Sequence, residues 1–223
     1  MRFNLSDNPV MRGLGRLCDL MILNILFIIC SIPIFTMGAS ITALYSVLLK
    51  MVKNEEGYIF KGFLKAFKDN FKRSTILWLI YLAAVIIIVI DIRIAFVINI
   101  PVLQNILLVI FSLAGVMTFF IGLYLFPMSA RYENTIRGTI KNSLLISVGR
   151  LPYTILLGVI HIAPIFIILL SAETFVIGIT LFFFVGFAVV AMLSSMVLRK
   201  VFVIMDPKDE LDDPDKIQAA PPR

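Results

Sequence analysis

Few side chains in this sequence could perform chemistry, and the clearest candidate lies inside a long apolar run. His161 is the one ionisable residue near the centre of such a run, three residues before Pro164. A histidine at this depth is a candidate functional residue, and its neutral form makes it the least costly ionisable side chain to place in hydrocarbon. We expect a hydrogen bond from His161 to a neighbouring helix, with a transport or sensing role as the alternative.

A second set of polar candidates lies in the first apolar run. Asn24 is expected to hydrogen-bond between helices rather than to contact a substrate. Pro33 removes a helical hydrogen bond and Gly38 adds backbone freedom, so the helix should kink or break between them. Unwound backbone inside a membrane often lines a cavity. The candidate polar lining of the bundle is therefore Asn24, Pro33, Thr36, Gly38 and His161.

Signatures of known catalytic sites are absent from the sequence. It contains no phosphate-binding Gly-x4-Gly-Lys-Ser/Thr loop, no His-Glu-x2-His zinc pair and no Gly-x-Ser-x-Gly elbow. Cys18 and Cys30 are twelve residues apart, which is about 18 Å along one helix and too far for a disulfide. We therefore expect a protein that is not an enzyme and has no cofactor or metal.

The composition indicates an integral membrane protein of the all-α class. Apolar residues make up 60% of the chain, charged residues 15%, and the mean hydropathy is +1.01. A helix needs about 20 residues to cross about 30 Å of hydrocarbon. Continuous apolar runs such as 83–90 and 181–188 exclude the alternating pattern of barrel strands. We predict a transmembrane helical bundle formed by one domain, 1–205, with a disordered acidic tail at 206–223. Its five spans are expected at about 20–49, 75–98, 104–127, 152–171 and 175–198.

The distribution of Lys and Arg predicts the orientation in a bacterial plasma membrane. The segments 50–74 and 127–152 and the border after the last span are basic, and short basic loops remain cytoplasmic. The C-terminus is therefore expected inside. Because these basic residues flank the spans, the net charge of +6 is explained by the orientation of the chain in the membrane and not by a nucleic-acid partner. For 20–49 we favour one kinked crossing with the N-terminus outside, and the alternative is a re-entrant hairpin with arms of about 13–15 residues.

The basic segments also have the pattern of amphipathic cytoplasmic helices. In 60–73, phenylalanines recur on one helical face and lysines on the opposite face. Such a helix could lie on an anionic inner leaflet or dock a cytoplasmic partner. The second such segment lies within 131–152. The candidate contacts with a partner or the membrane surface are Phe63, Lys65, Phe67, Lys68, Phe71, Lys72, Arg137 and Lys141.

Three segments resemble the YesL family of uncharacterised bacterial integral membrane proteins. They are 31–45 (SIPIFTMGASITALY), the Phe63-x3-Phe67-Lys-Asp-Asn-Phe71 motif, and 131–152. The resemblance implies a small polytopic protein, often encoded beside carbohydrate ABC transporters, and it supplies no reaction or binding site. We therefore expect a non-catalytic accessory or scaffold protein linked to carbohydrate ABC transport or its regulation. Its expected partners are the bilayer and either ABC transporter subunits or another membrane protein. The alternative is a small transporter or channel for a neutral solute.

Overall fold

The computed structural model of this chain describes residues 9–55, 57–98 and 100–205, and in this part of the chain all regular elements are helices. The predicted all-α class is therefore confirmed, whereas the predicted disordered tail, 206–223, lies outside the described residues. The elements are α1 (Pro9–Ser31), η2 (Ile34–Thr36), α2 (Met37–Val52), α3 (Ile59–Val97), α4 (Pro101–Arg131), α5 (Ile136–Gly149), α6 (Leu151–Ile168), α7 (Ala172–Leu181), η3 (Phe182–Gly186) and α8 (Phe187–Met205).

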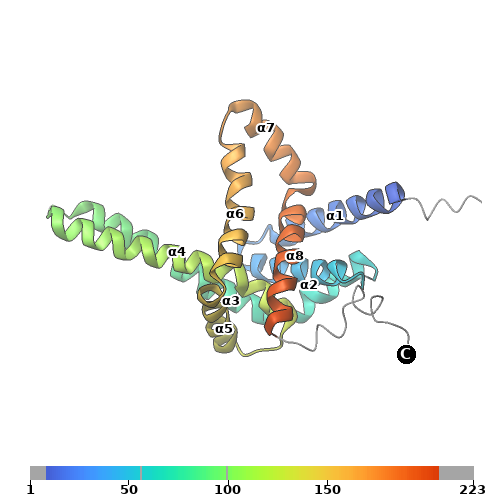
Figure 1. The fold of residues 1–223 in the computed structure, drawn as a ribbon, viewed down its shortest axis with the longest axis horizontal. Coiled ribbons are helices and arrows are strands. Elements are labelled where there is room, and N and C mark those ends of the chain that lie inside the picture. The colour runs from blue at the N-terminus through green and yellow to red at the C-terminus, as the bar shows by residue number, and fades with distance from the viewer. Residues whose placement is uncertain (1–8, 56, 99, 206–223) are drawn as a thin grey trace, which may run out of the picture.

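Three helical arms meet at one packed centre (Figure 1). One arm is formed by the second half of α3 and the first half of α4, drawn in green at the left of the view. A second arm, in orange, is formed by α6 with α7, and the third contains α1 and α2. At the centre, α2 packs against α3, α4 and α8. This centre holds the main hydrophobic core, which includes Leu48, Phe63, Tyr124 and Phe202.

Among the described residues, six helical segments are long and apolar enough to span a membrane. One of them, the segment containing α2, differs from the others because 67% of its most apolar window is buried inside the protein. In the other five segments that share lies between 6% and 22%. The apolar residues of α2 thus form the protein core, whereas most of those on the other segments lie at the surface. Length and composition alone cannot distinguish a helix buried in the protein core from one whose apolar residues lie at the surface.

The first apolar run forms a hairpin instead of the kinked helix that the sequence favoured. Helix α1 ends at Ser31, and α2 begins at Met37 after the short turn η2. The Arg16 guanidinium donates a hydrogen bond to the side-chain oxygen of Asn54, which joins the first half of α1 to the residues that follow α2. The two helices are therefore antiparallel. The α1 arm is longer than expected because the helix begins at Pro9 and has 23 residues.

The first basic segment is continuous with the span that follows it. Helix α3 has 39 residues, which corresponds to a length of about 58 Å. No Gly or Pro occurs between Gly62 and the end of α3 at Val97, so nothing in the local sequence interrupts the helix. The second basic segment forms a separate helix, α5, which lies between α4 and α6.

Candidate functional site

The aromatic and basic faces of the first half of α3 point in different directions. Phe63 is fully buried, and Phe67 packs partly buried against the same core. Phe63 is therefore not a contact for a partner or the membrane surface, because core packing covers the part of the aromatic face on which it lies. Phe71 remains 38% exposed. The side chains of Lys65, Lys68 and Lys72 are exposed, as are those of Lys61 and Phe60.

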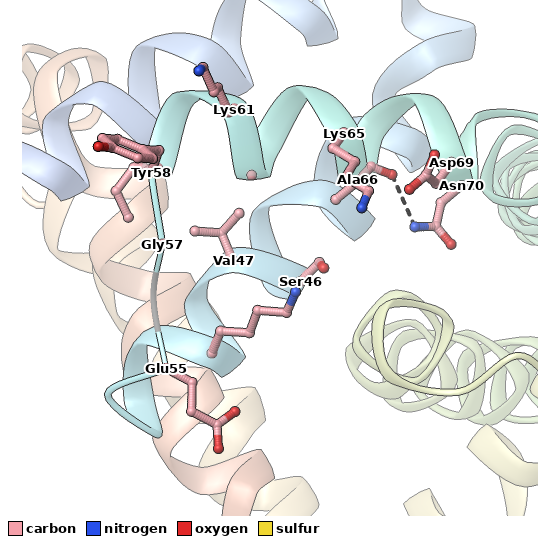
Figure 2. Close-up of a pocket in the computed structure, with 13 residues that line it drawn as sticks. Ser46, Val47, Glu55, Gly57, Tyr58, Lys61, Lys65, Ala66, Asp69 and Asn70 are labelled. Carbon is pink, nitrogen blue, oxygen red and sulfur yellow. Dashed lines mark hydrogen bonds between the residues drawn. The ribbon is translucent and has the colours of Figure 1, made fainter.

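A polar groove lies beside this basic face, between the end of α2, the following loop and the first half of α3 (Figure 2). Its volume is about 480 Å³. The Lys61 ammonium lies 5.6 Å from the centre of the Tyr58 ring, a distance at which a cation and an aromatic face attract. Asn70 donates a hydrogen bond of 3.0 Å to the Ala66 carbonyl within α3. The wall residues that carry side-chain polar groups are Ser46, Lys50, Glu55, Tyr58, Lys61, Lys65, Asp69 and Asn70.

The charges in the groove are mixed, with an excess of positive charge. Lys50, Lys61 and Lys65 line it together with Glu55 and Asp69. Among the residues that the structure describes, these lysines and carboxylates form no ion pairs with one another. Apart from the contact between Lys61 and the Tyr58 ring, these charged groups are therefore available to a partner, and complementary charge would orient that partner.

Arg73 connects the two basic helices, a role that the sequence pattern did not indicate. One guanidinium nitrogen, Nη2, donates to the Tyr132 carbonyl and to Thr139 Oγ1, both at 3.0 Å. The Tyr132 carbonyl precedes α5, and Thr139 lies in its first turns. Arg137 and Lys141 are exposed on the same helix. Arg73 thus holds the basic residues of α5 beside those of α3.

Asn24 makes the hydrogen bonds between helices that the sequence predicted. Its side-chain nitrogen donates to the carbonyls of Phe182 (3.0 Å) and Phe183 (2.8 Å), and its oxygen accepts from the Ala188 backbone N–H at 3.0 Å. Phe182 and Phe183 lie in η3, a π-helical turn whose altered bonding leaves backbone groups to be satisfied from outside. Asn24 lines neither the polar groove nor the apolar cavity that contains His161.

Thr36 and Gly38 are buried at the turn between α1 and α2 and Pro33 is exposed on it, so the three do not form an open polar lining. Thr36 Oγ1 donates to the carbonyls of Cys30 (2.6 Å) and Pro33 (2.7 Å), which closes the turn. From α3, Trp78 Nε1 donates to the Ile34 carbonyl at 2.8 Å. Gly38 lies so close to α3 that a Cβ atom there would be 2.4 Å from Trp78 Cβ.

His161 is the one predicted lining residue that reaches a cavity within the described structure. The cavity has a volume of about 920 Å³ and lies between α1, α2, the turn that joins them, α3, α4, α6, α7, η3 and α8. His161 Nδ1 is 2.9 Å from the Leu157 carbonyl, four residues earlier on the same helix. This bond replaces the bond to a neighbouring helix that the sequence predicted. The wall is largely apolar, so it does not suit passage of a polar neutral solute.

In the described part of the chain, no three His, Cys, Asp or Glu side chains gather closely enough to hold a metal ion. Neither the groove nor the cavity contains a pair of side chains placed as a nucleophile and its base. The described residues therefore offer surfaces for binding, and among them we find no set of groups placed for a reaction.

Comparison with known proteins agrees with the resemblance noted from the sequence. Residues 20–92 match the family described as "Protein of unknown function, DUF624". The chain is also similar to "Uncharacterized protein YesL" of Bacillus subtilis (strain 168), with 28% identity over 196 residues, 87% of this chain and 88% of that protein. No solved structure matches. The predicted resemblance to the YesL family is thus confirmed. The matched segment 20–92 contains the α1–α2 turn, all of α2 and the polar groove.

Proposed function

We propose that this relative of YesL is a non-catalytic integral membrane accessory protein that docks a partner on its basic face. The basic face comprises Lys61, Lys65, Lys68 and Lys72 of α3 with Arg137 and Lys141 of α5, and the polar groove lies beside it. The family resemblance supports an association with carbohydrate ABC transport or its regulation. The partner in this proposal is a transporter subunit or another membrane protein with a carboxylate-rich cytoplasmic surface, and not a nucleic acid.

The observation that carries the proposal is the division between Phe63 and the lysines on α3. Phe63 is fully buried in the core while Lys65 and Lys68 are exposed. A helix lying on a leaflet would instead place its aromatic residues in lipid. Because α3 is anchored through its aromatic side, the lysines are held in fixed positions on a rigid surface. Preorganised groups of this kind bind a partner with less loss of conformational entropy.

The length of α3 supports a location of this face outside the hydrocarbon. At about 58 Å the helix is nearly twice as long as the hydrocarbon core is thick, about 30 Å. The second half of α3 contains the long apolar stretch, so the charged first half is the part that extends beyond the bilayer. The seven basic residues between 50 and 73, five of which lie on α3, favour the cytoplasmic side of a bacterial plasma membrane. The C-terminus after α8 is on the same side in this proposal.

The hairpin also changes the proposed location of the N-terminal part of α1. Arg16 bonds to Asn54, which lies in the basic region that we place inside. We therefore propose that the α1–α2 hairpin enters and returns on the cytoplasmic side, with Arg16 inside rather than outside. This arrangement keeps all the basic segments of the described chain on one side of the membrane.

Affinity purification from native membranes at chromosomal expression level tests the proposal. The test variant is Lys65→Glu/Lys68→Glu, and the control is Lys200→Glu, an exposed lysine of α8 away from the groove. We expect wild type and the control to recover the same membrane protein, and the test variant to lose it while purifying in equal amount. Recovery of the wild-type protein alone, or equal recovery by both variants, would contradict the proposal.

A further inference from the structure

The 920 Å³ cavity lies among helices that the composition places in the membrane. Its inner wall includes Leu44 and Leu123, which are 3% and 6% exposed. Its rim includes Ile32, Ile165 and Leu169, which are 74%, 56% and 68% exposed. Because the exposed rim is apolar, the cavity opens toward the lipid side of these helices and not toward water.

An apolar cavity of this size needs an occupant. Its volume is close to the upper end of the range for ligand sites, about 300–1,000 Å³. Water would find few hydrogen-bond partners on this wall, and an empty space would forfeit the dispersion contacts of the side chains around it. The molecules that surround the rim in a bilayer are lipid acyl chains, so they are the apolar groups at highest local concentration.

Two polar side chains, Ser31 and His161, belong to this largely apolar wall. Ser31 lines the cavity, and its buried hydroxyl oxygen has no hydrogen-bond partner in the described structure. The Leu157 carbonyl can only accept, so His161 Nδ1 carries the hydrogen in that bond and Nε2 of the neutral ring is an acceptor. The wall therefore offers the His161 ring acceptor to a hydroxyl group, whereas the Ser31 oxygen is enclosed by protein atoms.

From these observations we propose that the cavity is a lateral binding site for an acyl chain of a membrane lipid. The chain enters past Ile32 and Leu169 and lies against Leu44 and Leu123, and His161 Nε2 accepts a hydrogen bond where the lipid carries a hydroxyl group. This site is separate from the basic face on α3 and does not depend on the proposed docking function.

Photolabelling in nanodiscs tests the site directly. The probe is a phosphatidylcholine with a diazirine midway along one acyl chain, and labelled residues of the full-length protein are mapped by mass spectrometry. Leu44 and Leu123 are too deeply buried for bulk lipid to label, so label there reports a chain inside the cavity. Ile86 and Ile87 of α3 are exposed and do not line the cavity, so they report bulk lipid.

Val190→Phe fills the cavity from α8, and Val189→Phe is the matched control because Val189 does not line it. We expect label at Leu44 and Leu123 in wild type and in Val189→Phe, and a decrease of about tenfold in Val190→Phe, as for about 1.4 kcal/mol of lost binding free energy. Label at Ile86 and Ile87 should be equal in all three proteins.

Ile41→Phe fills the same space from α2. A loss of label in both filled variants could not result from a folding defect specific to Val190→Phe. We expect Ile41→Phe to reduce the label at Leu44 and Leu123 as well. Label confined to Ile86 and Ile87 in the wild-type protein would overturn the proposal. An equal decrease in Val190→Phe and Val189→Phe would overturn it too, because the effect would then not depend on cavity volume.

Discussion

Arg16 and Asn54 are hydrogen-bonded although 38 residues separate them in the chain. The bond lies at the open end of the α1–α2 hairpin, and the Trp78 bond to the Ile34 carbonyl lies at its closed end. Together they define a helix pair that leaves the basic region of the molecule and returns to it.

The hairpin predicts that residues near Arg16 and residues after Asn54 lie on the same side of the membrane. In a background with Cys18 and Cys30 replaced by serine, Gly13→Cys and Tyr58→Cys should both resist an impermeant maleimide in intact cells. Both should react after permeabilisation, since both positions are exposed. Glu173→Cys, placed after the turn from α6 to α7, should react in intact cells. Reaction of Gly13→Cys in intact cells, with Tyr58→Cys protected, would instead support a single crossing by 20–49.

Gly38→Ala should destabilise the protein because α2 approaches α3 closely at this point. The added Cβ would lie 2.4 Å from Trp78 Cβ and 2.5 Å from the Ser74 carbonyl oxygen. Overpacking of this kind costs about 1–3 kcal/mol, and each 1 kcal/mol lowers the melting temperature by about 2–4 °C in a chain of this size. Thermal unfolding in detergent measures the change.

Gly62→Ala is the matched control for this prediction. Its Cβ would meet Val47 across the same pair of helices, but at an ordinary 3.7 Å. Its melting temperature should remain at or above that of the wild type, because alanine favours the helix over glycine. Equal losses in the two variants would show that close packing at Gly38 is not the cause.

Asn24→Leu should destabilise the junction between α1 and η3. The substitution keeps the approximate shape of the side chain but leaves the Phe182 and Phe183 carbonyls and the Ala188 N–H without this partner. Each buried group left unsatisfied costs about 1–3 kcal/mol. We expect a lower melting temperature in detergent for Asn24→Leu, and no loss for Asn105→Leu at an exposed position of α4. A melting temperature unchanged by Asn24→Leu would mean that these bonds contribute nothing to stability.

Arg73→Met should loosen α5 without unfolding the rest of the protein. Hydrogen bonds to charged groups contribute about 1.5–3 kcal/mol, and Arg73 makes two such bonds toward α5. Amide hydrogen exchange within 136–149 should therefore accelerate by about ten- to a hundredfold. Exchange within 151–168 serves as the internal control and should remain at its wild-type rate. Uniform acceleration across both helices would indicate global destabilisation instead.

Local sequence predicted several elements well because the causes are local. The apolar runs gave helices, Pro33 marked the place where the first run is interrupted, and the period of Phe and Lys along 60–73 matched the helix that forms there. Asn24 was expected to bond between helices because an amide in an apolar environment requires a partner. The Phe182–Gly186 π-helix had no local signal, since its partners come from α1.

Other features depend on contacts between distant segments, which a single sequence does not specify. A break at Pro33 permits either a kink or a reversal, and the bonds of Arg16 and Trp78 determine which one occurs. The period that placed Phe63 on one face did not indicate whether lipid, a partner or the core would cover that face. The composition of α2 matched a span, although most of the helix is covered by protein. In each case long-range packing decided the outcome.

The most direct test of the central claim is site-specific crosslinking from the basic face. A photoreactive benzoylphenylalanine is placed at Lys68, and in a second protein at Ile87 on the exposed apolar part of α3. Both proteins are expressed from the chromosome and irradiated in native membranes. Docking on the basic face predicts a discrete protein adduct from position 68 that is absent from position 87. Absence of any protein adduct at position 68, or the same adducts from both positions, would contradict it.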